Sequence, residues 1–203
     1  MLIILHASDL HFGKHFDPEA LDAYLAVLES TEPNLLVFSG DFTQRAKVQE
    51  YEAARDFLSA LPPIPTVVTP GNHDVPLYRV SERLFAPLRN YREFISEELD
   101  AVTRIPGATV VSLNSTDPHR GIVNGRLAAR QLRFAARAFQ DAPEGNARIL
   151  VTHHNLASPP DYRPEAVLPG YHRVMESLEA MGVELILAGH LHRGYLSTAA
   201  DLG

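Results

Sequence analysis

The chain has 203 residues, a formal net charge of −7 at pH 7 and no cysteine. The length suits one domain over residues 1–203, and the lack of cysteine excludes disulfides and thiolate metal sites. The acidic balance argues against nucleic acid as a partner, because such surfaces need clustered lysine and arginine. The first seven residues read as a strand, not a signal peptide, and no apolar run approaches about 18 residues. We therefore expect a cytoplasmic protein that does not associate with a membrane.

Short apolar runs alternate with amphipathic stretches in the first third of the chain. The runs are nearly continuous in valine, isoleucine and leucine, which is typical of strands covered on both faces. Apolar residues at helical spacing lie between them. In chain order we predict a strand, a helix, a strand, a helix and a strand over Leu2–Leu5, Pro18–Glu29, Leu35–Phe38, Val48–Ala60 and Thr66–Thr69.

The segment 75–106 breaks this rhythm, and we expect it to form a helical cap or rim insertion over the sheet. Its aromatic side chains are interpreted as core more readily than as a base-stacking platform; they are Tyr78, Phe85, Tyr91 and Phe94. Strand–helix alternation then resumes, interrupted by a proline-rich loop over Asn155–Gly170. We predict three further strands over Thr109–Leu113, Arg148–Thr152 and Glu184–Ala188. Two helices are predicted between them, over Leu127–Phe139 and Tyr171–Met181. The whole pattern predicts a layered α/β fold.

Five polar clusters follow five of the predicted strands, each at the point where a strand ends. Ligands in open α/β sheets gather outside the carboxyl ends of the strands. The clusters supply carboxylate, amide and imidazole donors, which suit zinc, manganese or iron. They are Asp9-Leu10-His11, Gly40-Asp41, Gly71-Asn72-His73-Asp74, His153-His154 and Gly189-His190-Leu191-His192.

The donors are numerous enough for two metal ions. One ion could be held by Asp9, His11, Asp41 and His192, and a second by Asp41, Asn72, His153 and His190, with Asp41 as the bridge. Two divalent cations, two carboxylates and a bridging hydroxide leave a charge of about +1, which suits a phosphodiester monoanion. This charge balance favours phosphoryl chemistry.

His73 is not needed to complete either set of donors. We interpret it as a catalytic donor to the phosphoryl oxygens or a general acid for the leaving alkoxide. Asp74 follows directly and is expected to orient the imidazole and favour its protonated form. Gln44 and Ala46, after Gly40-Asp41, are expected near the site.

Together these motifs resemble the calcineurin-like metallophosphoesterase superfamily over most of the chain, from Ile3 to Arg193. Within it, Ser8-Asp-Leu-His-Phe-Gly13 and Pro70-Gly-Asn-His-Asp-Val-Pro76 are similar to bacterial class III cyclic-nucleotide phosphodiesterases. The resemblance implies a four-layer α/β/β/α sandwich and the same seven metal ligands. It also implies two divalent or mixed-valence ions of manganese, iron or zinc. The implied reaction is phosphodiester hydrolysis by a bridging hydroxide, with a cyclic nucleotide such as cAMP as substrate.

Two departures from the family pattern concern the later part of the chain. Relatives often place prolines after the paired histidines, where this chain has Asn155-Leu156, so we expect a different loop on the substrate side. Family members usually continue with further strands after the last motif, where this chain has Gly194–Gly203. We expect either a truncated C-terminal part or another cover for the sheet edge, such as a partner subunit in a homo-oligomer.

Other readings of the same residues stay open at this point. Asp9 and Asp41 are also typical helix caps or turn residues, and Asn72 a left-handed turn residue. Adjacent residues leaving a strand point to opposite sides, so one of His153 and His154 should face the metals, and the family analogy favours His153. Other substrates are a glycerophosphodiester, DNA ends or a nucleotide-lipid pyrophosphate. The non-enzymatic alternative is a scaffold that keeps the fold without the chemistry.

Overall fold

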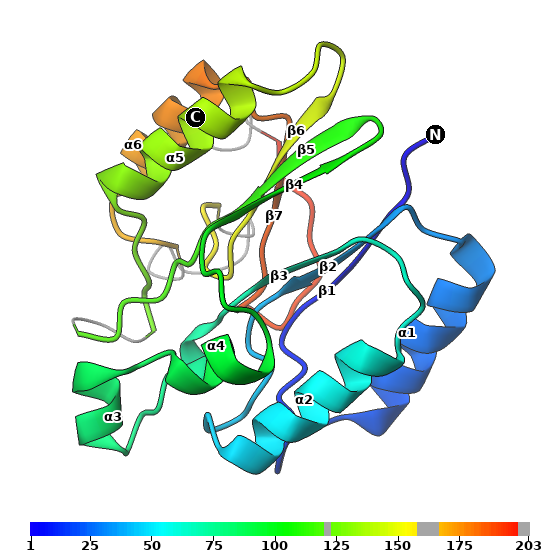
Figure 1. Cartoon of the computed structure of the whole chain (residues 1–203). Helices are drawn as coiled ribbons and strands as arrows, with labels where there is room; N and C mark the ends of the chain where they lie inside the picture. Colours follow the sequence, from blue (N-terminus) through cyan, green and yellow to red (C-terminus); the bar gives the residue numbers. More distant parts are fainter. Residues whose placement is uncertain (120–122, 158–166, 199–203) are drawn as a thin grey trace.

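The computed structural model describes residues 1–119, 123–157 and 167–198. Two β-sheets pack face to face, and helices cover their outer faces (Figure 1). The first sheet is parallel, with the order β1-β2-β3, and its strands are β1 (Ile4–Ala7), β2 (Leu35–Ser39) and β3 (Thr66–Thr69). The second sheet has the order β4-β5-β6-β7. Its strands are β4 (Ala101–Ile105), β5 (Ala108–Ser112), β6 (Ala147–Val151) and β7 (Leu185–Leu187).

The helices form the two outer layers. Helix α1 begins with Pro18 at its first turn and is capped by the Asp17 side chain, which accepts from the Glu19 and Ala20 amides. Helices α5 and α6 lie over the second sheet (Figure 1). The helices are α1 (Pro18–Thr31), α2 (Val48–Ala60), α3 (Val80–Phe85), α4 (Arg89–Phe94), α5 (Ala129–Gln140) and α6 (Tyr171–Ala180), with a 3₁₀ turn η1 (Asn72–Asp74).

Three apolar layers hold the architecture together. The central layer lies between the sheets and is built mainly from strand residues, including Leu35, Val37, Val110, Ile149 and Val151. One outer layer packs the first sheet against α1, α2 and α4, and the other packs the second sheet against α5 and α6. All five residues of β2 and all five of β5 are buried, as their unbroken apolar runs predict. The four-layer α/β/β/α fold is confirmed.

The segment 75–106 departs from the expectation of helices alone. It contains α3 and α4 but ends in β4, which pairs antiparallel with β5 across a turn at Pro106-Gly107. Gly107 has φ +87°, a left-handed conformation that favours glycine and allows the sharp reversal. The aromatic residues also divide: Tyr91 is fully buried, whereas Tyr78 is 73% exposed and Phe85 86% exposed. The interpretation of all four as core is therefore wrong for Tyr78 and Phe85.

Two other expectations concern loops and membranes. The predicted proline-rich loop Asn155–Gly170 falls largely outside the described residues, which include only 155–157 and 167–170 of it. Among the described helices, none combines the length and the apolar character needed to cross a membrane.

Candidate metal centre

The five polar clusters meet at one edge of the sandwich because both sheets direct the carboxyl ends of their parallel strands there. The chain keeps pairing beyond the strands: the Asp9 amide donates to Gly40 O at 2.9 Å, and the His11 amide donates to Asp41 O at 2.9 Å. In the second sheet the Gly189 amide donates to His153 O at 3.0 Å. The first three clusters therefore come from the first sheet and the two histidine clusters from the second.

Left-handed backbone conformations are concentrated at these clusters. The described residues include seven non-glycine residues with positive φ, and five of them are predicted ligands: Asp9 (58°), His11 (48°), Asp41 (56°), His190 (73°) and His192 (50°). Such residues are uncommon outside functional sites because each conformation costs about 1–3 kcal/mol. Asp9 and His11 are therefore both left-handed, and this local geometry turns both side chains toward the other donors.

One donor group is formed by Asp9, His11 and His192. The Nε2 atoms of His11 and His192 lie 3.0 Å apart, and His192 Nε2 lies 3.4 Å from Asp9 Oδ1. Ser8 Oγ donates to Asp9 Oδ2 at 2.5 Å, and the His190 amide donates to the same oxygen at 2.9 Å. The carboxylate is thus held in place from two sides.

A second donor group is centred on the Asn72 side-chain oxygen. His153 Nε2 and His190 Nδ1 each lie 2.9 Å from Asn72 Oδ1. His153 Nδ1 donates to the backbone carbonyl of Ser39 at 2.8 Å, which fixes its tautomer and leaves Nε2 available toward the centre. A fixed tautomer of this kind is typical of metal-binding histidines.

Asp41 lies between the two donor groups. Its Oδ2 is 3.3 Å from His153 Nε2 and 3.8 Å from His11 Nε2, and the residue is 1% exposed. Its Oδ1 accepts from the His73 amide at 2.7 Å. The side chain therefore reaches one imidazole of each group while its other oxygen is held by the backbone.

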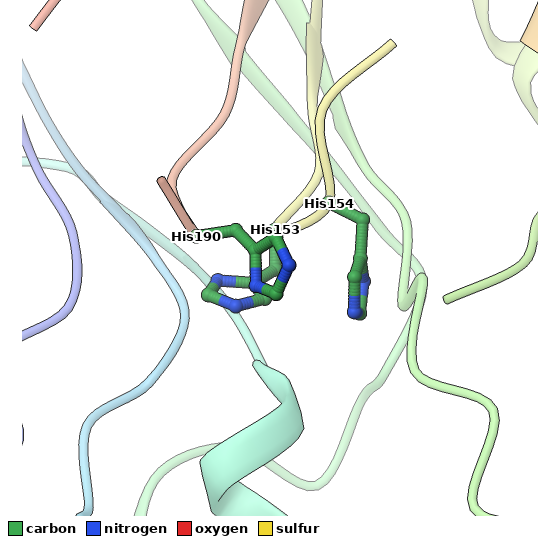
Figure 2. Close-up of side chains that lie close together, drawn as sticks. All are labelled: His153, His154 and His190. Carbon is green, nitrogen blue, oxygen red and sulfur yellow. The ribbon is translucent and has the colours of Figure 1, made fainter. Parts of the chain in front are cut away.

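His153 and His154 take different partners, although their rings are close. Figure 2 shows the rings of His153, His154 and His190 converging, with centroids 4.8–5.2 Å apart. His154 Nδ1 lies 2.8 Å from the Ser115 hydroxyl, in the loop after β5, whereas His153 faces Asn72 and Asp41. Nitrogen atoms of these three histidines also form a group within 4.8 Å.

His73 and Asp74 have separate surroundings. His73 Nδ1 donates to the Gln44 carbonyl at 2.9 Å, and its ring meets His11 edge-on at 4.7 Å between centroids. The Asp74 carboxylate instead accepts from the amides of Gly71 at 2.9 Å and Thr43 at 2.9 Å. Asp74 therefore ties the loops after β2 and β3 together, and Gln44 takes the place expected for Asp74 beside the His73 ring.

Burial and neighbouring charges within the cluster shift several pKa values. Burial lowers the pKa of His153, but the neighbouring Asp41 carboxylate outweighs it and raises the pKa to about 9. Burial and the charge of His153 lower the pKa of His190 to about 4. Burial and the nearby Asp41 raise the pKa of Asp74 to about 7. Without metal, a proton on His153 thus balances Asp41, so metal binding there must displace that proton.

The donor set fits metal ions by type and spacing. Three groups of carboxylate and imidazole donors each place their ligand atoms within 4.8 Å of one another; they are Asp9–His11–His192, Asp9–Asp41–His153 and His11–Asp41–His73. Neutral imidazole nitrogens and carboxylate oxygens gathered this closely are stabilised when a cation lies among them. The clusters are consistent with a dimetal site. Sequence reasoning did not identify Ser8 or the Ser39 carbonyl as supports, and a backbone carbonyl leaves no sequence signal.

Comparison with known proteins agrees with this geometry. Residues 2–194 match the family model described as calcineurin-like phosphoesterase. A probable cyclic nucleotide phosphodiesterase of a Synechococcus species is 28% identical over 96% of this chain and 75% of its own length. One from Rhodococcus erythropolis is 28% identical over 98% of this chain and 67% of its own length. UDP-2,3-diacylglucosamine pyrophosphatase LpxG of Chlamydia trachomatis is 32% identical over 58% of this chain and 39% of its own length.

Solved structures show the same fold at low sequence identity. The purple acid phosphatase PPD1 of yellow lupin superposes with a TM-score of 0.69 at 12% identity, over 94% of this chain and 38% of that protein. The phosphopantetheinyl hydrolase of Mycobacterium tuberculosis gives a TM-score of 0.55 at 14% identity, over 97% of this chain and 85% of that protein. The family match over residues 2–194 and the converging donor clusters lead to one conclusion: the chain belongs to the calcineurin-like phosphoesterase family.

Proposed function

We propose that this protein hydrolyses phosphodiesters with two metal ions, and that cyclic nucleotides such as cAMP are its substrate class. The observation that carries the proposal is the placement of Asp41. One buried carboxylate oxygen lies 3.3 Å from an imidazole of one donor group and 3.8 Å from an imidazole of the other. A carboxylate shared in this way is the natural bridge between two cations 3.5–4 Å apart, the usual spacing of such pairs.

The ligand assignment follows the two donor groups. Asp9, His11, Asp41 and His192 hold one ion, and Asp41, Asn72, His153 and His190 hold the other. Manganese, iron and zinc all suit these oxygen and imidazole donors. When bound, the ions supply an activated water molecule and positive charge opposite the phosphoryl oxygens.

The protein's own groups orient the reaction. The Ser39 carbonyl keeps His153 Nε2 directed inward, and Ser8 holds Asp9. His73, with Nδ1 bound to the Gln44 carbonyl, presents its Nε2 as the donor to a phosphoryl or leaving-group oxygen. The cyclic-nucleotide assignment is supported by the two bacterial relatives, which match over nearly the whole chain.

A second candidate substrate is a nucleotide-lipid pyrophosphate. The Chlamydia relative acts on UDP-2,3-diacylglucosamine by its name, and it matches about half of this chain. A strip of exposed apolar side chains follows the Gly71–Asp74 loop directly and would suit acyl chains. The strip consists of Leu77, Tyr78, Val80, Leu84 and Phe85.

Metal analysis paired with a generic substrate tests the proposal first. Elemental analysis of the purified chain should give about two metal ions, and Mn²⁺ should restore bis-p-nitrophenyl phosphate hydrolysis after chelation. Cyclic AMP and a UDP-linked acyl sugar are then compared at equal concentration. Faster turnover of the acyl sugar would favour the second candidate. A folded protein without metal or activity would favour the non-enzymatic scaffold.

A further inference from the structure

The hydrogen-bond ladder between β6 and β7 extends into the loops that carry the histidines. The Thr152 amide donates to Leu187 O at 3.0 Å, and the Gly189 amide donates to His153 O at 3.0 Å. The next rung is made by a side chain: Asn155 Nδ2 donates to Gly189 O at 2.6 Å. Asn155 lies two residues after His153, and Gly189 directly precedes His190. The amide thus joins the two loops at the point where the ladder would otherwise end.

The Asn155 amide is itself fixed in orientation. The residue is 3% exposed, and its Oδ1 lies 3.0 Å from the Tyr195 hydroxyl, whose single proton is shared between Asn155 Oδ1 and Ala157 O, 2.5 Å away. The Asn155 carbonyl accepts from the Leu168 amide at 2.9 Å. A buried amide is costly unless its polar atoms are bonded, so these contacts hold the side chain in one rotamer.

The Gly189 backbone, which accepts the Asn155 hydrogen bond, is tightly packed against the donor groups. A Cβ built on this residue would lie 2.6 Å from Ser8 Cβ and 2.7 Å from Asp9 Oδ2, so the backbone packs directly on a predicted ligand. His190, the next residue, has φ 73°. A left-handed backbone persists only where surrounding contacts define it. Asn155 therefore supplies a side-chain bond at a point where the backbone has little room to move.

We propose that Asn155, oriented by Tyr195, is a positioning residue that sets the distance between His153 and His190. The proposal rests on the proposed function, in which these two imidazoles hold the same ion with Asn72 and Asp41. The other donor group is spaced by a different set of contacts, including the bond from the Asp9 amide to Gly40 O at 2.9 Å. The Asn155 amide acts directly on the loop that carries His190 and reaches Asp9 only through the Gly189 backbone. Its loss should therefore weaken the position held by His153 and His190 more than the other.

Cobalt titration of the metal-free chain, followed by visible absorption, tests this directly because it reports each equivalent separately. Asn155→Ala should weaken binding of one Co²⁺ equivalent by about 10–100-fold and leave the other near its wild-type affinity. Tyr195→Phe should weaken the same equivalent by a smaller factor. The double variant should bind no more weakly than Asn155→Ala, because the hydroxyl acts through the amide.

Asn34→Ala is the matched control. In the wild-type chain Asn34 Oδ1 accepts from the Ile3 amide at 2.9 Å, at the end of the first sheet opposite the donor groups. The variant therefore loses a comparable hydrogen bond far from the proposed metal positions. Both cobalt equivalents should bind to it as to wild type. If Asn155→Ala binds both equivalents normally, or weakens both in step with its metal-free melting temperature, the positioning role is refuted. If Asn155→Ala does not fold, Tyr195→Phe decides by the same criterion. A wild-type chain that binds fewer than two equivalents would instead refute the dinuclear proposal.

Discussion

At the residue scale, His73 differs from the other imidazoles in what holds it. Its Nδ1 is bound to the Gln44 carbonyl, and its amide donates to Asp41 Oδ1 at 2.7 Å. The His73 ring is thus fixed beside the donor groups, whereas His153 and His190 contact Asn72 and His192 contacts Asp9. This placement suits a proton or hydrogen-bond donor, whose contribution appears in the rate of reaction more than in metal binding.

His73→Ala should therefore lower kcat for bis-p-nitrophenyl phosphate by about 10²–10⁴-fold, while metal content stays near two per chain. The backbone amide that binds Asp41 is unaffected by the substitution. His172→Ala, in α6, is the control and should match wild type in both measurements. Loss of bound metal in His73→Ala would show that His73 is a ligand.

His6, which is not among the proposed ligands, makes the stability of the fold depend on pH. Its Nε2 lies 2.7 Å from the Ser39 hydroxyl, across the first sheet. Burial lowers the pKa of His6, and the charge of Asp9 opposes this only in part. The folded state therefore keeps His6 neutral, while the unfolded chain takes up a proton near pH 6.5. The resulting stability is full above pH 6.5 and is lost as pH falls toward the lower, folded-state pKa.

Urea unfolding of the metal-free protein between pH 7.5 and 5.5 checks this term. His6→Asn cannot titrate, so its unfolding free energy should fall less steeply than that of wild type, by at most about 1.4 kcal/mol per pH unit. Other buried histidines contribute to both proteins alike, so the difference between the two curves isolates His6. Parallel curves would show that His6 keeps its ordinary pKa in the folded chain.

At the scale of elements, the turn after β3 depends on a close approach of two loops. A Cβ on Gly71 would collide with Asp41 Oδ1 and with the Asp41 amide. Gly71 does not have a left-handed φ, so its requirement for glycine is steric. The small residue lets the Asn72–Asp74 turn pack directly on the residue that bridges the two donor groups.

Gly71→Ala should accordingly destabilise the fold by about 1–3 kcal/mol through overpacking, and it should also displace Asp41 and reduce metal content. Gly194→Ala is the matched control, because a Cβ there meets no described atom within 4 Å. Chemical denaturation and elemental analysis of both variants measure the two effects. If Gly71→Ala binds two metals and unfolds like wild type, the loops have room that the structure does not show.

At the scale of the whole molecule, the site is assembled from both sheets. Asp9, Asp41 and Asn72 follow strands of the first sheet, and His153 and His190 follow strands of the second. The apolar layer between the sheets fixes the distance between these two sets. Metal ions bound across this boundary would bind the folded state alone and so stabilise it.

Saturating metal should thus raise the unfolding free energy of the chelated protein by about 2.7 kcal/mol for each site that is filled at a concentration 100 times its Kd. Calorimetry before and after chelation measures the shift. Asp41→Ala should lose most of it, because it removes the shared ligand. Asp17→Ala, which removes the cap of α1, should lower the melting temperature but keep the metal-induced shift. An equal shift in both variants would contradict the bridging role of Asp41.

Most of the described elements could be predicted from the sequence, and the assignment of the donors as ligands stays a prediction. The apolar run Leu35–Phe38, and the run Ile149–Val151 within the predicted strand Arg148–Thr152, are buried because the core of a strand covered on both faces must be apolar. The sequence analysis did not predict β4. Its short run of mixed apolar and polar residues follows a helical segment and becomes a strand through pairing with β5. The family match bears out the recognition of the superfamily and of the fold.

The contacts that support the donors are visible only in the tertiary structure. The left-handed turns at Asp9 and His190, the Ser39 carbonyl behind His153 and the Asn155 amide on Gly189 join residues far apart in the chain. Periodicity reports which face of an element is apolar, but it carries no information about which loops meet at the sheet ends. That juxtaposition follows from packing the two sheets, so Gln44 beside His73 and the loop-tying role of Asp74 emerged only in three dimensions.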